Sequence, residues 1–235
     1  MDDPFDLAYP FTGRWLVQNS PADRVPRHGT ELFASAYAID FVPVAANGRT
    51  APVTRSALIG TEPPERFPGF GRDILAPVDG VVVLAYGSES DHAAYRGLRS
   101  LGYAATQGRR ATAGWRALAG NHVLIESRGT FVALCHLQQN SVQVRAGQTM
   151  TVGDPIGRCG NSGNSTEPHV HIQAGDSADF DRAEAVPITF AGSLPANRQI
   201  VDLKLGGGWE CRRSGALGPT GTGWSGDRDA MPPEG

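Results

Sequence analysis

The sequence predicts an all-β-dominated fold in which short strands form an antiparallel sheet, curled into a groove or packed as a sandwich. The 235 residues include 30 glycines and 17 prolines, while aromatic residues make up only 8% of the chain. This composition is typical of many turns between short strands and not of a helical bundle. The apolar runs are also short and are bounded by glycine, proline or asparagine, which favours strands. The length suffices for one well-packed domain with a modest extension.

Charge and hydropathy exclude several functional classes. The formal net charge of -3 and the pI of about 6.1 give no basic surface for nucleic acid. No apolar run approaches the roughly 18 residues of a transmembrane segment. The acidic N-terminus lacks the basic and apolar regions of a secretory signal, so the chain as written is expected to be cytoplasmic. An incomplete N-terminus or a non-standard export route would make it extracellular, so the sequence leaves the compartment open.

Three cysteines do not form a recognisable framework. Cys135, Cys159 and Cys211 are odd in number and have no short spacing, so neither a disulfide scaffold nor a zinc knuckle is indicated. We expect free, buried thiols, with a Cys135–Cys159 bridge as the minor alternative.

The first half of the chain contains two predicted strands. Residues 1–27 are interrupted by proline and aspartate and are interpreted as an N-terminal extension. Residues 37–42 predict a strand, and residues 43–73, rich in proline, glycine and arginine, predict a long loop. A turn at residues 76–80 leads into the apolar, β-branched strand 81–86.

Residues 87–120 interrupt this succession of short strands and turns and are interpreted as an inserted, helical segment that borders the groove. Strands resume beyond it, where a turn at 128–130 predicts a hairpin. The predicted strands are 122–126, 131–137, one that begins at 142–144, and 169–173. From residue 206 the composition shifts to glycine, proline, serine and charge, which predicts a disordered tail over 206–235. The predicted domain therefore spans 28–205.

Two histidines in the last predicted strand suggest a metal site. Side chains at positions i and i+2 of a strand point to the same face, roughly 6.5–7 Å apart. His169 and His171 therefore present two imidazoles on one face. One can bind a metal while the other stands beside the open coordination position. The alternative is a pair of histidines on a solvated strand face.

Three further residues strengthen the metal hypothesis. Asp40 lies between large apolar residues, and a carboxylate is costly to bury unless it is paired or binds a metal. His136 ends a strand of strong β-formers, and His28 precedes a glycine. Each also has a simpler interpretation: a salt-bridged aspartate, a structural strand histidine, and a histidine that caps a turn.

The order His…Asp…His…His-x-His resembles the lysostaphin/LytM-like zinc metallopeptidases. The most specific part of the resemblance runs from Gly153-Asp154-Pro155-Ile156-Gly157 through a Gly-Asn-Ser/Thr loop to Pro168-His169-Val170-His171. The stretches Ala76–Val82, Gly120–Val123 and Cys135–Leu137 match the pattern in the same order. The resemblance covers residues 28 to 175 apart from the insertion.

This resemblance implies an antiparallel β-sheet groove with one Zn²⁺ ion per chain on its floor. Matching the family pattern to this sequence assigns His28, Asp40 and His171 as the metal ligands. It assigns His136 and His169 as the two catalytic histidines that do not bind the metal. His92 and His122 match no functional position. Relatives place the first histidine and the aspartate only a few residues apart, whereas residues 29–39 separate them here. This stretch is expected to bulge out as a loop over the groove.

The implied activity is zinc-dependent endopeptidase chemistry, in which metal-activated water hydrolyses peptide bonds in peptidoglycan crosslinks or stem peptides. The sequence leaves open which of His136 and His169 is the general base. An alternative is a catalytically silent relative that uses the groove to bind a partner or to activate a hydrolase. A biotinyl- or lipoyl-type carrier module would share the turn pattern around residues 144–154, but it explains none of the histidines.

Overall fold

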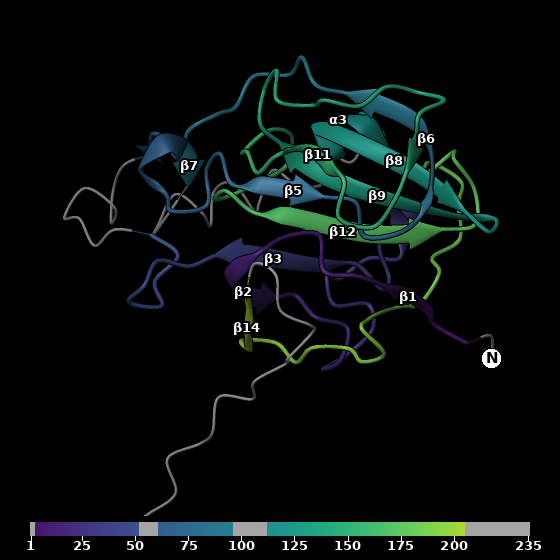
Figure 1. Cartoon of the computed structure of the whole chain (residues 1–235), viewed down its shortest axis with the longest axis horizontal. Coiled ribbons are helices and arrows are strands. Elements are labelled where there is room, and N and C mark those ends of the chain that lie inside the picture. The colour runs from purple at the N-terminus through teal and green to yellow at the C-terminus, as the bar shows by residue number, and fades with distance from the viewer. Residues whose placement is uncertain (1–2, 52–60, 96–111, 205–235) are drawn as a thin grey trace, which may run out of the picture.

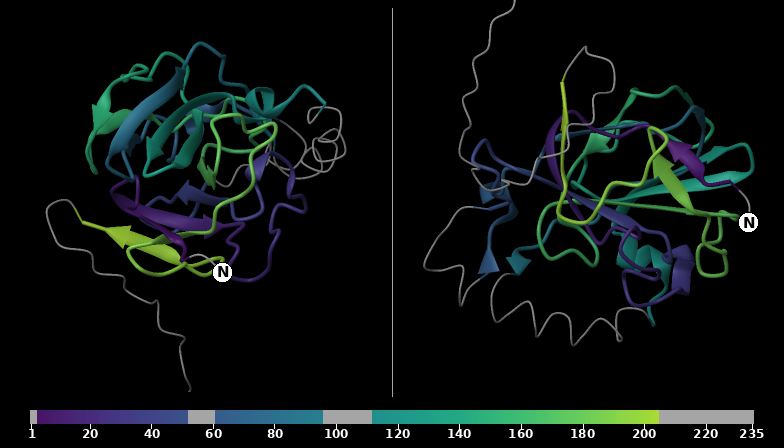
Figure 2. Two further views of the ribbon diagram at one scale, coloured as in Figure 1. Left: turned by 90° about the vertical axis from the view of Figure 1, so that its right-hand side faces the viewer. Right: turned by 90° about the horizontal axis from the view of Figure 1, so that it is seen from below.

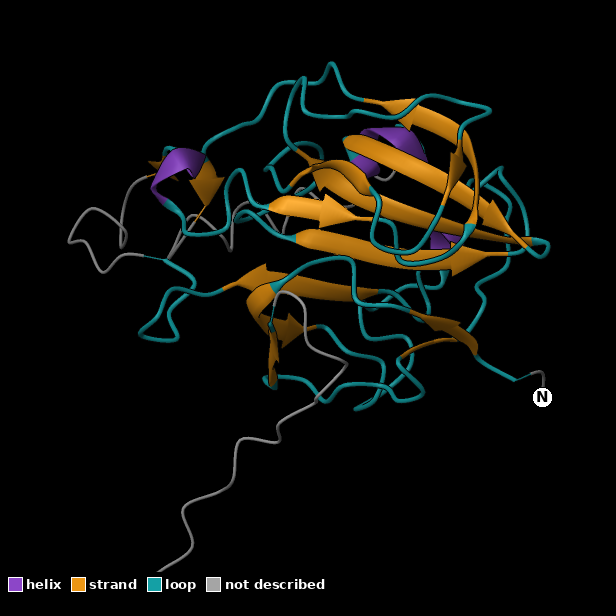
Figure 3. Ribbon diagram, in the orientation of Figure 1, coloured by secondary structure: helices purple, strands orange, loops and turns teal. Residues whose placement is uncertain are grey.

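The computed structural model describes residues 3–51, 61–95 and 112–204. Strands dominate them and helices are few and short (Figure 3), which confirms the predicted β-dominated fold. None of the described helices is long and apolar enough to cross a membrane. The strands are β1 Phe5–Leu7, β2 Gly13–Gln18, β3 Ile39–Pro43, β4 Thr61–Glu62, β5 Asp73–Leu75, β6 Gly80–Tyr86, β7 Ala94–Tyr95, β8 Asn121–Ser127, β9 Thr130–Leu137, β10 Thr149–Met150, β11 Pro155–Arg158, β12 Val170–Gly175, β13 Ile188–Phe190 and β14 Ile200–Leu203. The helical turns are η1 Leu32–Ala34, η3 Pro64–Arg66 and α3 Trp115–Ala119.

An eight-stranded antiparallel sheet forms the centre of the molecule. Its order is β10-β6-β8-β9-β12-β3-β2-β14. The long strands β8, β9, β12 and β3 lie side by side in Figure 1, with β2 and β14 beyond β3. The described residues add three two-stranded pairings, β1 with β13, β5 with β11 and β4 with β7. The two further views show the sheet curling along its length (Figure 2).

Strand alternation divides the sheet into two different faces. One face carries the large apolar side chains of the main core, among them Trp15, Phe41, Ile125, Leu134 and Ile172. The intervening positions point the other way. There, a smaller apolar cluster forms over the sheet from α3 and its neighbours, with members Ala34, Trp115, Ala119, Leu124, Ala133, Cys135 and Phe180. The predicted site residues Asp40 and His171 lie on this second face, because they alternate with core residues along their strands.

The predicted hairpin at residues 128–130 is confirmed. Ser127 pairs with Thr130, so Arg128 and Gly129 form a two-residue turn between β8 and β9. Both turn residues have positive φ, 51° and 82°, which is the type I′ conformation that matches the twist of the flanking strands.

Two local predictions, a strand beginning at 142–144 and an unbroken loop over 43–73, are wrong. Residues 142–144 form no strand. Val144 is buried in the main core and Val142 packs beside it, so their alternation reflects packing of an irregular segment. The predicted loop 43–73 contains β4 and η3.

The predicted insertion 87–120 is only partly described. Its described residues contain the short strand β7 and the helix α3 at Trp115–Ala119, and residues 96–111 lie outside the described residues.

The segment before His28 contributes to the central sheet. Strand β2 pairs with β3 on one side and β14 on the other, and Trp15 is fully buried. The domain boundary at residue 28 stays a prediction, but residues 13–18 share the core of the unit that follows. The predicted tail over 206–235 lies outside the described residues.

Candidate metal centre

The register of two neighbouring strands places an aspartate opposite a histidine. Asp40 on β3 pairs directly with His171 on β12, and directly opposed residues on one face have Cβ atoms about 4.5–5.5 Å apart. His171 Nδ1 lies 2.8 Å from Asp40 Oδ1. The pair is central in the sheet, so neither side chain is freely solvated.

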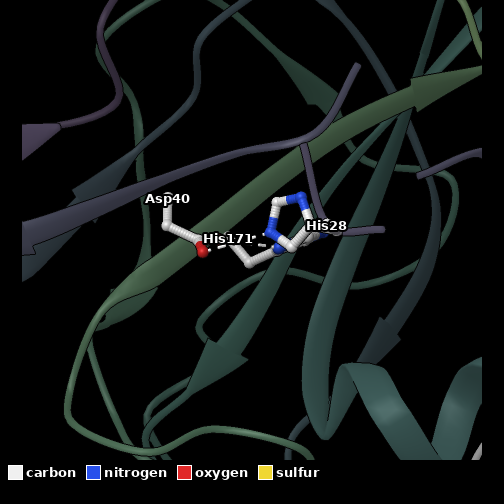
Figure 4. Close-up of side chains that lie close together, drawn as sticks. All are labelled: His28, Asp40 and His171. Carbon is white, nitrogen blue, oxygen red and sulfur yellow. Dashed lines mark hydrogen bonds and ion pairs between the residues drawn. The ribbon is translucent and has the colours of Figure 1, made fainter. Parts of the chain in front are cut away.

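His28 reaches the same carboxylate from a loop. Its Nε2 lies 3.1 Å from Asp40 Oδ2, and its ring stacks edge-on against His171 with centroids 5.1 Å apart. The close-up in Figure 4 shows the three side chains converging, with His28 approaching from outside the two strands. Each residue offers one ligand atom, and these three atoms lie within 4.8 Å of one another. The long separation of His28 and Asp40 in sequence therefore does not keep them apart.

Two amide side chains hold the cluster from outside, and sequence reasoning missed both. Asn19, just after β2, donates from Nδ2 to Asp40 Oδ2 at 2.7 Å. Gln173, two residues after His171 on the same strand face, lies with Oε1 2.8 Å from His171 Nε2. Alternation from His171 could have identified Gln173. Nothing in the sequence marks Asn19, because its place beside Asp40 depends on the pairing of β2 with β3.

His136 enters the site through a β-bulge. Leu134 pairs with Val123 and Leu137 with Asn121, so two residues of β9, Cys135 and His136, stand opposite one residue of β8. His136 has a φ of 62°, a left-handed conformation that is uncommon for a residue other than glycine. The bulge turns the His136 side chain to the same face as Cys135 and His171, as bulges near active sites commonly do.

The His136 ring is held by a backbone carbonyl. Its Nδ1 lies 2.9 Å from the carbonyl oxygen of Ser162. A carbonyl only accepts, so Nδ1 carries the hydrogen and Nε2 of the neutral ring is a free acceptor. Its ring centroid is 4.7 Å from that of His169 and 5.8 Å from that of His171.

His169 is oriented in the same way. Its Nδ1 lies 2.8 Å from the carbonyl oxygen of Glu167 and 3.0 Å from Ser165 Oγ. Since Nδ1 donates to the carbonyl, Nε2 faces the cluster without a hydrogen, 3.6 Å from Asp40 Oδ1. Two imidazoles therefore present proton-accepting atoms beside Asp40 and His171.

Electrostatics favour a charged carboxylate and a neutral His136. Burial would raise the pKa of Asp40, but interactions with His28 and His169 and the bonds from His171 and His28 hold this pKa well below its ordinary value. Burial lowers the pKa of His136 well below its ordinary value, and electrostatic interactions with the neighbouring His169 and His171 lower it further. Burial also acts to lower the pKa of His171, but its bond with Asp40 and the charge of that carboxylate raise it.

The cluster lies in a cavity of about 550 Å³. The loop that follows His28 forms one part of its wall, and α3 with the 164–166 segment forms another. Its lining residues are Asn19, His28, Gly29, Thr30, Leu32, Phe33, Ser35, Asp40, Trp115, Leu118, Ala119, Cys135, His136, Asn164, Thr166, His169, His171 and Gln173. All five predicted site residues are among them, and the end of the predicted insertion borders the cavity.

The other two histidines have structural contacts. His92 Nε2 lies 2.9 Å from the carbonyl oxygen of Gly163. His122 is buried against Trp115, and its Nδ1 lies 2.6 Å from the carbonyl oxygen of Gly120. Neither lines the cavity, as expected for residues that match no functional position.

Comparison with known proteins shows which family part of the chain resembles. The sequence profile of peptidase family M23 matches residues 101–180. This segment contains His136, the Gly-Asn-Ser loop and the His169–His171 pair. Over this segment the chain is similar to the M23 peptidases. The resemblance to lysostaphin/LytM-like proteins is thereby confirmed, while His28 and Asp40 lie N-terminal to the matched segment.

Solved structures of M23-type proteins also match. The catalytic domain of lysostaphin from Staphylococcus simulans is 16% identical, with 77% of this chain and 88% of that domain covered and a TM-score of 0.37. Pseudoalterin, an M23 metalloprotease from the deep sea, is 14% identical, with 78% and 75% covered and a TM-score of 0.38. A zinc-containing peptidase from Vibrio cholerae is 18% identical, with 67% and 50% covered and a TM-score of 0.33. The chain thus spans half the length of the Vibrio protein and 47% of whole lysostaphin.

The donor set of the cluster fits a zinc ion. Two imidazole nitrogens and one carboxylate oxygen are typical zinc ligands, and with bonds of about 2.0–2.1 Å a tetrahedral site separates them by about 3.3 Å. His171 Nδ1 lies 2.8 Å from Asp40 Oδ1, and His28 Nε2 lies 3.1 Å from Asp40 Oδ2. One ligand atom from each residue lies within 4.8 Å of the other two, which is close to the separation that zinc requires. His28, Asp40 and His171 are the residues that would hold the ion.

Proposed function

We propose that this chain is a zinc metalloendopeptidase that hydrolyses peptide bonds in peptidoglycan crosslinks or stem peptides. The observation that carries the proposal is the convergence of His28, Asp40 and His171 beside two further histidines whose Nε2 atoms are free acceptors. The family match supports peptidase activity. Peptidoglycan peptides are the substrate class that the lysostaphin/LytM-like resemblance implies.

Bound zinc in such a site polarises a carbonyl group and makes water at its open position more acidic. The chain supplies the remaining elements. Asp40 stays ionised because of its lowered pKa, so the ligand set carries a negative charge that offsets part of the charge of the cation. His28 closes the set from the loop side.

His136 and His169 are the groups that can move protons. Each keeps its Nδ1 hydrogen on a backbone carbonyl, so only Nε2 is available to accept a proton from the attacking water. The protonated ring can then stabilise an oxyanion by hydrogen bonding or protonate the leaving amine. The lowered pKa of His136 disfavours its protonated form, so this ring gives up a proton readily.

The cavity walls orient the substrate. Leu32 is 61% exposed at the lip of the cavity, whereas Trp115 on the α3 side is almost fully buried. A peptide lying between the 29–35 loop and α3 would pass over the cluster of ligands, with its backbone near His136 and His169.

A pair of histidine variants tests the proposal. We expect His171→Ala to lose zinc, and His169→Ala to keep zinc while the rate falls roughly 10²- to 10⁴-fold, the range for loss of a general acid or base. The measurement is hydrolysis of defined peptidoglycan peptides by the full chain, with zinc content determined on the same samples. Zinc binding without hydrolysis of any such peptide would favour the non-catalytic binding module instead.

A further inference from the structure

Gln173 occupies an unusual position between the metal centre and the cavity wall. It lies two residues after His171 on β12, so both side chains point to the same face, and it is 3% exposed. Its Oε1 is 2.8 Å from His171 Nε2, and its Nε2 donates to the backbone carbonyl of Phe33 at 2.6 Å. One buried amide thus contacts both a candidate ligand and the loop that follows His28.

The two bonds determine where the hydrogens lie. The carbonyl of Phe33 can only accept, so the NH₂ group of Gln173 must face it and Oε1 must face His171. Oε1 also only accepts, so His171 Nε2 must carry a hydrogen. Without a cation, Nδ1 carries a second hydrogen that it donates to Asp40 Oδ1 at 2.8 Å. Because Nε2 is already engaged by Gln173, Nδ1 is the ring atom at which a cation could replace a hydrogen.

The loop end of this bridge is itself well defined. Phe33 has φ of 62° and ψ of 32° within η1. The hydroxyl of Ser35 donates to the carbonyls of Thr30 and Leu32, which braces the turn around it. Thr30, Leu32, Phe33 and Ser35 all line the cavity, so the segment that Gln173 anchors is also a segment that substrate would contact.

We infer that Gln173 is a positioning residue that sets the tautomer of His171 for metal binding through Nδ1 and ties this ligand to the 29–35 loop. The metal half of this inference, the role of Gln173 in orienting His171 for zinc, rests on the proposed function. The loop half, its bond to the 29–35 loop, does not. Partners that donate or accept at the remote nitrogen of a ligating histidine typically change metal affinity by about 10- to 100-fold.

Two substitutions separate the two bonds. Gln173→Met has a similar length but can neither accept from His171 nor donate to Phe33. Gln173→Glu still accepts from His171 Nε2 but cannot donate to the Phe33 carbonyl. Gln138→Met makes the same exchange at a glutamine outside the cavity lining, whose Oε1 has no hydrogen-bond partner, and serves as the matched control.

The experiment measures zinc affinity by chelator competition and hydrogen–deuterium exchange of residues 29–35 on the full chain. We expect zinc affinity to fall about 10- to 100-fold in Gln173→Met and to be largely restored in Gln173→Glu. Exchange in the loop should accelerate in both variants and stay unchanged in Gln138→Met. Rescue by glutamate distinguishes positioning from general destabilisation, because both variants lose the bond to the loop.

The outcomes also distinguish this inference from the proposed function. Zinc affinity in Gln173→Met within about threefold of the unaltered chain, together with unchanged loop exchange, would overturn the role of Gln173 and leave the metallopeptidase proposal intact. No zinc binding by the unaltered chain would overturn the proposed function and the metal half of the inference together. Unchanged loop exchange in both Gln173 variants would by itself overturn the tie to the loop.

Discussion

At the scale of single residues, the candidate site is organised around one carboxylate. Oδ2 of Asp40 contacts His28 and Asn19, and Oδ1 contacts His171 and lies near His169. A buried carboxylate is costly unless its charge is matched. The interactions of Asp40 with these histidines hold its pKa well below the ordinary value. The carboxylate therefore stays ionised, and a positively charged partner is needed to offset the cost of burying it.

Asn19 is expected to tune this carboxylate. Its amide donates to Asp40 Oδ2 at 2.7 Å, so Asn19→Ala should free the carboxylate to rotate and weaken zinc binding by about 10-fold, the lower end of the range for outer-shell partners. The measurement is zinc affinity by chelator competition. Asn140→Ala is the matched control, because Asn140 has a similar positive φ, 58° against 51°, but lies outside the cavity lining. Equal affinities in the two variants would contradict the assigned role.

His122 should make the fold sensitive to mild acid. Burial lowers the pKa of this residue, while in the unfolded chain it returns to about 6.5. Between the folded and unfolded pKa values the unfolded state binds more protons, so the free energy of unfolding falls as the pH drops from about 7 toward 5. In His122→Phe, this fall should be smaller. The measurement is urea unfolding at both pH values in the presence of a chelator, and identical pH dependence in the two proteins would count against the prediction.

At the scale of elements, one irregularity in β9 places a catalytic candidate. The residues of 130–137 read as an uninterrupted strand, and strict alternation would send the side chains of Cys135 and His136 to opposite faces. The bulge opposite His122 instead brings both into the cavity lining. Bulges depend on the pairing of two strands, so this orientation could not be predicted from the sequence of β9 alone.

A close contact between two glycines holds α3 against the loop before the histidine pair. Gly163 has a φ of 66°, and a Cβ there would lie 2.4 Å from Gly120 N and 2.5 Å from the carbonyl oxygen of Leu118. Since Leu118 and Ala119 line the cavity, this contact fixes one wall of the site. The arrangement explains why a glycine-rich loop precedes the histidines.

Gly163→Ala should therefore destabilise the fold more than an alanine at an unconfined glycine. Gly153→Ala is the control, because Gly153 also has positive φ, 92°, but nothing lies within 4 Å of its Cβ position. The control should lower the free energy of unfolding by about 1–2 kcal/mol, the cost of a left-handed alanine. Overpacking should add about 1–3 kcal/mol at Gly163. Urea unfolding measures both, and equal losses would show that the contact relaxes without cost.

At the scale of the whole molecule, the sequence predicted the positions of the strands that build the site better than it predicted their pairing and register. The expected strands near residues 37–42, 81–86, 122–126 and 131–137 correspond to β3, β6, β8 and β9, because their β-branched runs are bounded by turn residues. The prediction of a strand at 142–144 was wrong because apolar and polar residues alternate in this irregular segment, where the valines pack against the core. The register that sets Asp40 opposite His171 is a long-range property that local patterns do not contain.

The five site residues came from the order of a family pattern, and the structure brings them into one cavity. Considered one at a time, each of these residues also allowed a purely structural interpretation, such as a salt bridge or a turn cap. What the pattern could not supply was the outer layer, Asn19 and Gln173, because these amides act through contacts between β2, β12 and the loop after His28. Their roles follow only from the folded arrangement.

The most direct test of the central claim is the zinc content of the purified full chain, measured by elemental analysis beside Asp40→Ala and Asp202→Ala. Asp202 lies on β14 of the same sheet and pairs with Arg14 at the surface, so it controls for loss of a strand carboxylate. We predict about one zinc per chain in the unaltered protein and in Asp202→Ala, and none in Asp40→Ala, because Asp40 joins the two candidate histidine ligands. Zinc retained in Asp40→Ala, or no zinc in the unaltered chain after loading at neutral pH, would contradict the account.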